Sequence, residues 1–284
     1  ADAVKDYPDG NLLSQLSVTI RALTFYVSHS FFPINLSAYY AVPLEKSIFE
    51  SPVFISLIFI LSLLIIAIYS IKRFPIIFFC IGWFFISLFP VSGIIPLSNF
   101  MADRYLYIPM VGFAIFLSLS IYSLSIRFAE KTGIKKAAVI FLIPISLIIF
   151  EFSGLTLARA KIWEEELILW EDTLHKEPRA PYLYGALGKA YLDKGMPEAA
   201  LVALSAGLEM LKENSEVAKD IRYTRGYTFY CMGDYAGAVR DFERLIQIDS
   251  NYPSAYFGLM LTYRDVGDKE KALRLIERYI ELFA

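Results

Sequence analysis

The sequence predicts an all-α protein in which a transmembrane helical bundle is followed by an α-solenoid of helical repeats. Long uncharged runs fill the first half of the 284-residue chain, and 56% of all residues are hydrophobic. Charged residues become frequent only after Lys161. Beyond that point, a pattern of glycine, alanine and aromatic residues recurs at intervals of 38 and 34 residues, which is typical of stacked helical repeats.

The change in charge density predicts two domains, a transmembrane domain over 1–158 and a repeat domain over 159–284. A helix needs about 20 apolar residues to cross the hydrocarbon core of a bilayer. Four or five stretches meet or approach this length, at about 12–33, 53–71, 74–90, 105–126 and 137–158.

Two of these stretches contain residues that interrupt a helix. Arg21 lies inside 12–33, which therefore either crosses the bilayer, where a charge is costly and usually functional, or lies at its interface. Pro90, Gly93 and Pro96 predict that the third helix ends near Phe89.

Lysine and arginine predict the orientation, because short basic loops tend to remain in the cytoplasm. Two short loops are basic: one holds Lys72 and Arg73, and the other holds Arg127, Lys131, Lys135 and Lys136. The alternate loops carry one cation each, Lys46 in one and Arg104 in the other. By alternation, the loop with Asp103 and the repeat domain are extracytoplasmic, on the periplasmic or lumenal side.

The C-terminal residues form three units of one pattern, in which aromatic and leucine side chains alternate with small residues. The pattern resembles the tetratricopeptide repeat, in which small residues let paired helices approach each other. The resemblance implies a core made of Tyr184, Leu187, Gly188, Tyr191 and Ala200 in the first unit, Gly226, Phe229, Ala238 and Phe242 in the second, and Tyr256, Leu259, Tyr263 and Ala272 in the third.

Helices of this domain are expected at 162–176 and in repeats over about 181–214, 219–252 and 253–284. In the first helix, Trp163 and Trp170 are expected to pack inward.

Two further features of the repeats stand out. Gly233 and Gly267 are expected to form the turns within repeats, because glycine adopts positive φ without a steric penalty. Arg222 and Arg225 depart from the pattern, because they occupy positions where apolar residues are expected.

Asp103 and Arg104 are the only charged residues between the third and fourth apolar stretches. Arg104, with Tyr105 or Tyr107, could hold the phosphate of a lipid-linked donor, since a guanidinium presents a planar fork of hydrogen-bond donors. Asp103 and Arg21 are further candidates for this site. A structural interpretation stays open, in which Asp103 caps a helix and Arg104 extends toward lipid headgroups.

Three segments add a second resemblance. They are Arg-Ala-Leu-Thr-Phe-Tyr (21–26), Phe-Pro-Ile-Asn-Leu-Ser (32–37) and Ala-Asp-Arg-Tyr-Leu-Tyr-Ile-Pro (102–109). Followed by the repeats, they resemble the C-terminal part of transmembrane O-mannosyltransferases of the GT-C class. The resemblance implies sugar transfer from a polyprenyl-phosphate donor to protein. Members of that class carry catalytic carboxylates in their first outer loop, and no equivalent is visible in this chain.

Two functions therefore remain open. The chain is either the C-terminal portion of a membrane glycosyltransferase, whose repeats bind the protein acceptor or a partner, or a non-catalytic membrane-anchored scaffold. The catalytic residues are unknown, and no cofactor or metal site is evident in the sequence. The net charge of −2 gives no support to nucleic-acid binding. Because the sequence starts at Ala1 and not at Met, we expect a processed or partial chain.

Overall fold

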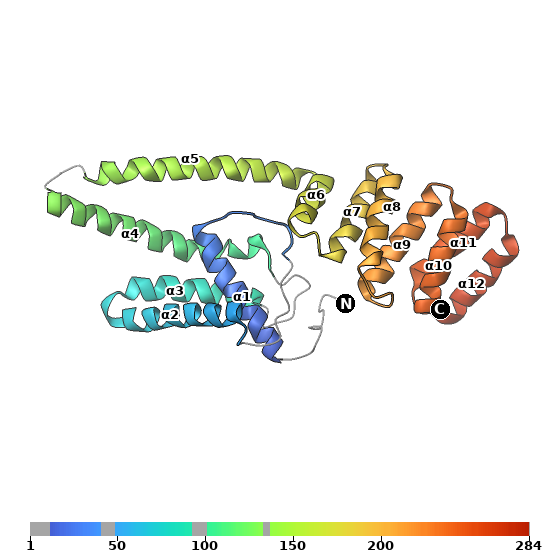
Figure 1. Ribbon diagram of the computed structural model, residues 1–284, viewed down its shortest axis with the longest axis horizontal. Helices are drawn as coiled ribbons and strands as arrows, with labels where there is room; N and C mark the ends of the chain where they lie inside the picture. The colour runs from blue at the N-terminus through green and yellow to red at the C-terminus, as the bar shows by residue number, and fades with distance from the viewer. Residues whose placement is uncertain (1–11, 41–48, 93–100, 133–136, 284) are drawn as a thin grey trace. The chain divides into compact units, whose positions relative to one another are not determined.

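The computed structural model describes residues 12–40, 49–92, 101–132 and 137–283, and these residues form helices joined by turns, with no strand among them (Figure 1). The chain divides into two compact units, Ala1–Ala160 and Lys161–Ala284. The sequence placed the change of domain between residues 158 and 159. Some residues used in the sequence argument lie outside the described residues: Gly93, Pro96, Lys135 and Lys136.

The first unit holds α1 (Leu12–Phe31), α2 (Ser51–Arg73), α3 (Pro75–Leu88), α4 (Pro109–Thr132) and most of α5 (Ala137–Glu164). Proline lies in the first turn of α2 and α3, where its missing N–H has no helical partner to lose. The two helices form an antiparallel hairpin (Figure 1). A 3-10 turn at Phe89–Val91 follows α3, so this helix ends where Pro90 predicted.

Among the described helices, α2 and α4 are long and apolar enough to cross a membrane, by length and composition. The helix α3 is apolar but shorter. Many apolar side chains of α2 point away from the protein, including Ile65 and Ile68, each 66% exposed. Such exposure is unusual for a helix surrounded by water.

The fourth apolar helix begins later than expected. Residues Asp103–Leu106 form a separate 3-10 turn, and α4 starts only at Pro109. Asp103 is therefore not at the head of the long helix. The capping residue of the 3-10 turn is Ala102, and no side chain caps it, so the expectation that Asp103 is a helix cap is wrong.

Aromatic and aliphatic side chains of α1 and α3 form the core of the first unit. Tyr26 of α1 is fully buried and packs in one cluster with Phe84 and Leu88 of α3. The helices α3 and α4 approach closely at Gly112, where an added Cβ would lie 2.9 Å from the carbonyl oxygen of Cys80.

The second unit begins with α6 (Glu166–Lys176), and three antiparallel helix pairs follow (Figure 1). The pairs are α7 (Pro181–Asp193) with α8 (Pro197–Glu209), α9 (Glu216–Cys231) with α10 (Tyr235–Ile248), and α11 (Pro253–Val266) with α12 (Lys269–Phe283). Each pair turns at a glycine with positive φ: 73° at Gly195, 77° at Gly233 and 89° at Gly267.

The segment before the repeats differs from the expected single helix over 162–176. Glu165 is extended, with φ −122° and ψ 122°, so α5 ends at Glu164 and α6 starts at Glu166. Trp163 is 50% exposed, so its expected inward packing is wrong. Trp170 is half-buried and meets the ring of Tyr182 edge-on at 6.4 Å.

The repeat core consists of side chains that fill the space between helices where small residues leave room. Buried residues of the pattern are Leu187, Gly188, Ala200, Gly226, Ala238, Phe242, Tyr256, Leu259 and Ala272, and the half-buried ones are Tyr184, Tyr191, Phe229 and Tyr263. Phe242 lies between two glycines, since a Cβ on Gly226 or Gly258 would come within 2.9 Å or 2.6 Å of its ring.

Candidate functional site

Asp103 lies in a polar cluster of the first unit, beside the loop that follows α1. The Tyr40 hydroxyl donates to Asp103 Oδ1 at 2.6 Å, and the Ser37 backbone N–H donates to the Tyr40 oxygen at 2.9 Å. The adjacent Ala102 N–H donates to the buried Tyr26 hydroxyl at 3.1 Å. These bonds fix the 3-10 turn against α1, so the Asp103 carboxylate points inward.

Burial is the main influence on the charge of this cluster. It raises the pKa of Asp103, and the Tyr40 hydrogen bond, His29 and Arg159 act in the opposite sense. The pKa of Tyr40 is also raised, first by burial and then by its bond to Asp103. Tyr40 therefore stays protonated and remains a donor to the carboxylate.

Ser37 adds a buried hydroxyl to this cluster. The hydroxyl of Ser37 is buried and makes no hydrogen bond in the described part of the chain. Sequence reasoning assigned no site role to Ser37, Tyr40 or Arg159, because only the fold brings them to Asp103. In the sequence, Tyr39 and Tyr40 are typical of aromatic residues at a membrane interface and do not indicate a contact with Asp103.

The residues predicted to hold a lipid phosphate do not converge. Arg104 is exposed, and its guanidinium lies 5.3 Å from the centre of the Tyr105 ring. Tyr107 is 81% exposed, while Asp103 accepts a hydrogen bond from Tyr40. Arg21 is half-buried on α1. Arg104 thus lies beside Tyr105, and the phosphate-binding role of these residues stays a prediction.

The first helices of the repeats present a second candidate site. Tyr182, Tyr227 and Phe257 on α7, α9 and α11 are 45%, 42% and 55% exposed. They lie on successive first helices that touch directly, because the Tyr230 hydroxyl of α9 donates to Asp265 of α11 at 2.6 Å. We define the first-helix surface as these three aromatic residues with the exposed charged residues Lys189, Asp193 and Asp220.

Both acidic side chains of this surface interact with tyrosines. The pKa of Tyr227 is raised, first by its hydrogen bond with Cys231, with a smaller contribution from the negative charge of Asp193 on α7. Asp220 accepts a hydrogen bond from the Tyr252 hydroxyl at 2.9 Å. The first-helix surface therefore combines exposed rings with two carboxylates and one ammonium group.

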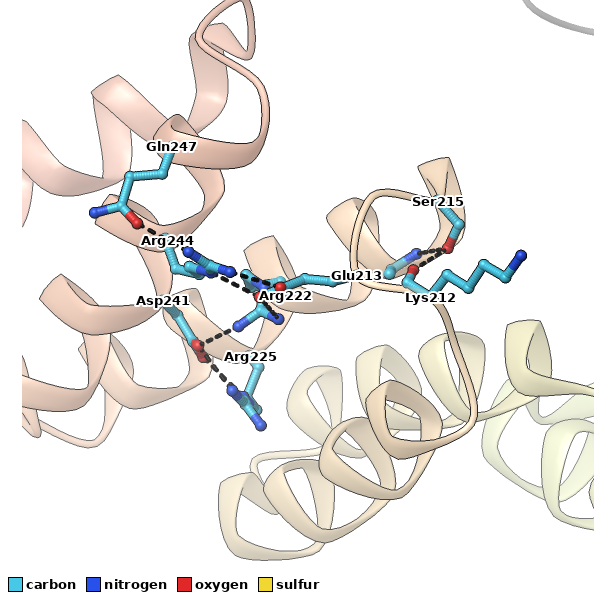
Figure 2. Close-up of polar contacts among 9 residues, drawn as sticks. Lys212, Glu213, Ser215, Arg222, Arg225, Asp241, Arg244 and Gln247 are labelled. Atoms are coloured by element: carbon cyan, nitrogen blue, oxygen red, sulfur yellow. Dashed lines mark hydrogen bonds and ion pairs between the residues drawn. The ribbon is translucent and has the colours of Figure 1, made fainter.

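An ion-pair network joins α9 and α10 in the middle repeat (Figure 2). Asp241 of α10, with 6% of its side chain exposed, accepts from Nε and Nη2 of Arg225, each at 2.7 Å. Arg222 of α9 lies 3.5 Å from the same carboxylate and 3.1 Å from Glu213. Glu213 also binds Arg244. The two arginines that departed from the repeat pattern thus have acidic partners.

Hydrogen bonds repeat along the array as well. The Tyr191 hydroxyl donates to Glu171 at 2.7 Å, and Tyr263, 72 residues later, donates to Glu243 at 2.9 Å. The middle repeat has Phe229 at this position and Ser205 in place of the glutamate. Ser205 instead accepts from Arg225 at 3.3 Å. The polar contacts of neighbouring repeats are therefore equivalent in position but not in chemistry.

Comparison with known proteins supports the assignment of the C-terminal helices as repeats. It gives no information on the function of the first unit. No protein-family model matches the chain. A TPR repeat-containing protein of Methanocaldococcus jannaschii is 32% identical over 59 residues, which are 21% of this chain and 10% of that protein. This chain therefore spans about a tenth of that relative's length.

Two solved structures of MamA are also similar. They show 24% and 22% identity, both with a TM-score of 0.38, and the alignments cover 41% and 48% of this chain and 66% and 72% of theirs. The sequence similarity to the archaeal protein, with the helix pairs and glycine turns described above, identifies the repeats as tetratricopeptide-like.

Proposed function

We propose that this protein is a membrane-anchored scaffold whose tetratricopeptide-like repeats bind a protein partner on the extracytoplasmic side. The single observation that carries the binding role is the first-helix surface, where Tyr182, Tyr227 and Phe257 expose their rings on successive first helices. Stacked repeats form extended surfaces suited to a peptide or helix. Exposed aromatic residues are the commonest anchors of protein interfaces.

The charges on this surface favour a partner segment that carries a cation beside an apolar side chain. Asp193 of α7 acts on Tyr227, and Asp220 is exposed on α9 two helical turns before Tyr227. Lysine or arginine placed between these carboxylates would gain complementary electrostatics, while an apolar neighbour would cover the Tyr227 ring.

The membrane anchor is supported by α2 and α4, which have the length and composition of spanning helices. Sugar transfer, the other function that the resemblance implies, finds support among the described residues only in Arg104 beside Tyr105. The scaffold role rests on more of the chain, because the repeats fill most of the second unit.

Site-specific photocrosslinking in native membranes tests the binding role. A benzophenone side chain at Tyr227 or Phe257 should crosslink to a partner, while one at Val202 on α8, 73% exposed, should not. With the crosslinked partner purified, Tyr227→Ala should weaken binding by about 30-fold, as for an interface anchor. Crosslinks from Val202 alone, or an unchanged affinity of the Tyr227 variant, would contradict this surface.

A further inference from the structure

An apolar groove runs along α3 and α4 in the first unit. One part of it, a cavity of about 390 Å³, is lined by side chains of α1, α2, α3 and α4, all of them apolar. A second part of about 400 Å³ continues along α3 and α4. The two parts share Ile77, Cys80 and Phe116, so they adjoin each other along α3 and α4.

The length of the groove suits an extended hydrocarbon chain. Its α4 wall extends from Phe113 to Arg127, which at 1.5 Å per residue is about 21 Å. This length is about two-thirds of the thickness of the hydrocarbon core of a bilayer. The first part is lined by apolar side chains alone, and the second adds Ser120 and Ser123, of which Ser120 donates to the Phe116 carbonyl oxygen at 2.7 Å. Most of the groove therefore favours an apolar ligand over water or a polar one.

Among the described residues that line the groove, the charge lies at one end. Arg127 lines it there, together with Phe74 at the α2–α3 turn. Lys72 and Arg73 directly precede Phe74, and the Arg73 guanidinium lies 5.8 Å from the Phe74 ring centre. Among the described residues, no ion pair involves Arg127. The groove therefore combines an apolar interior with a cationic end.

We propose that this groove binds an anionic phospholipid, with an acyl chain along α3 and α4 and its phosphate at Arg127. The positive-inside argument places Arg127 on the cytoplasmic side, where anionic lipids are attracted by basic residues. A neutral lipid would fill the apolar part equally well but would gain nothing from the cationic end. The inference rests on the proposed membrane anchoring and adds a ligand to it.

The test uses the full chain reconstituted in nanodiscs of phosphatidylcholine with one-fifth phosphatidylglycerol, then released into mild detergent for native mass spectrometry. Retained lipid should be enriched in phosphatidylglycerol by about five-fold over the bulk mixture, the effect expected for one cation near the headgroups. Arg127→Gln should abolish the enrichment, and Arg127→Lys should keep it. Ser123→Trp, which places an indole in the groove, should lower retention of both lipids.

Arg240→Gln is the matched control, because it removes the same charge from an exposed position in the repeats. Equal enrichment in the Arg127→Gln and Arg240→Gln proteins would overturn the inference, as would retention that Ser123→Trp leaves unchanged. A chain that fails to enter nanodiscs would instead refute the membrane anchor itself. Incorporation without phosphatidylglycerol enrichment would refute the lipid site alone.

Discussion

At the scale of single residues, the middle repeat replaces an apolar contact with an ion pair. Arg225 and Asp241 occupy the positions that hold Leu259 and Leu275 in the third repeat, 34 residues later. Both charged groups lie in the helix interface, and the guanidinium binds the carboxylate through two nitrogens. Loss of one partner would leave the other charge buried without compensation.

Asp241→Ala should therefore destabilise the middle repeat by about 3–5 kcal/mol, the usual cost of breaking a buried ion pair. The double variant Arg225→Leu with Asp241→Leu copies the third repeat and should recover most of this loss. Hydrogen exchange of the slow amides in α9 and α10, measured on the full chain, reports both effects.

Glu213→Ala is the control for this experiment, because it removes an exposed acidic residue from the same network. It should change exchange far less than Asp241→Ala, since exposed ion pairs contribute little. If the slow amides of α9 and α10 exchange equally fast in Asp241→Ala and in the double leucine variant, the loss of stability does not come from an unpaired Arg225.

Sequence reasoning at this scale could detect the unusual residues but not their partners. Arg222 and Arg225 stood out because they interrupt a repeated apolar pattern. Their partner Asp241 lies on another helix, and only the register of α9 against α10 brings them together. For the same reason the inward orientation of Asp103 was missed, because Tyr40 is 63 residues away in the chain.

At the scale of the helix, side-chain volume is matched between neighbouring repeats. Phe242 on α10 is fully buried, and the following helix α11 carries Gly258 against its ring. The repeat before it has the smaller Leu204, and the equivalent of Gly258 is Thr224. The larger Phe242 is thus accommodated by a glycine on the next helix, whereas the smaller Leu204 is followed by a threonine at the equivalent position.

Gly258→Ala should consequently cost about 1–3 kcal/mol, as expected for overpacking, because its Cβ would lie 2.6 Å from the Phe242 ring. Phe242→Leu should relieve the clash, so the double variant should be more stable than the sum of the single changes predicts. Thermal unfolding of the full chain measures this coupling. If the stability changes of the two single variants add up to that of the double variant, the two residues do not compete for the same space.

Helices and turns were the most predictable level of this structure. The glycine turns at 233 and 267 follow directly from the need for positive φ. The start of α4 was not predictable from hydropathy, because Tyr105 and Leu106 are apolar enough to continue the helix. Instead, the Ala102 N–H donates to the Tyr26 hydroxyl and the Tyr40 hydroxyl donates to Asp103, and these bonds hold residues 102 and 103 in a separate turn.

At the scale of the whole molecule, the proposed function depends on which side of the membrane carries the repeats. The loop-charge argument assigns the turn with Lys72 and Arg73 to the cytoplasm and the repeats to the opposite side. Long domains follow this rule less strictly than short loops. An independent reporter in the repeats is therefore needed, and the chain already contains one.

Cys231 is exposed on α9, whereas Cys80 is buried on α3. A membrane-impermeant maleimide should label the native protein at Cys231 in right-side-out vesicles, and Cys231→Ser should abolish labelling. In that background, Thr132→Cys at the exposed end of α4 should react only after the vesicles are permeabilised, because it belongs to the basic cytoplasmic side. The reverse pattern, with position 132 accessible and Cys231 protected, would place the repeats in the cytoplasm. The first-helix surface would then face cytoplasmic partners, and Arg127 would lie on the extracytoplasmic side.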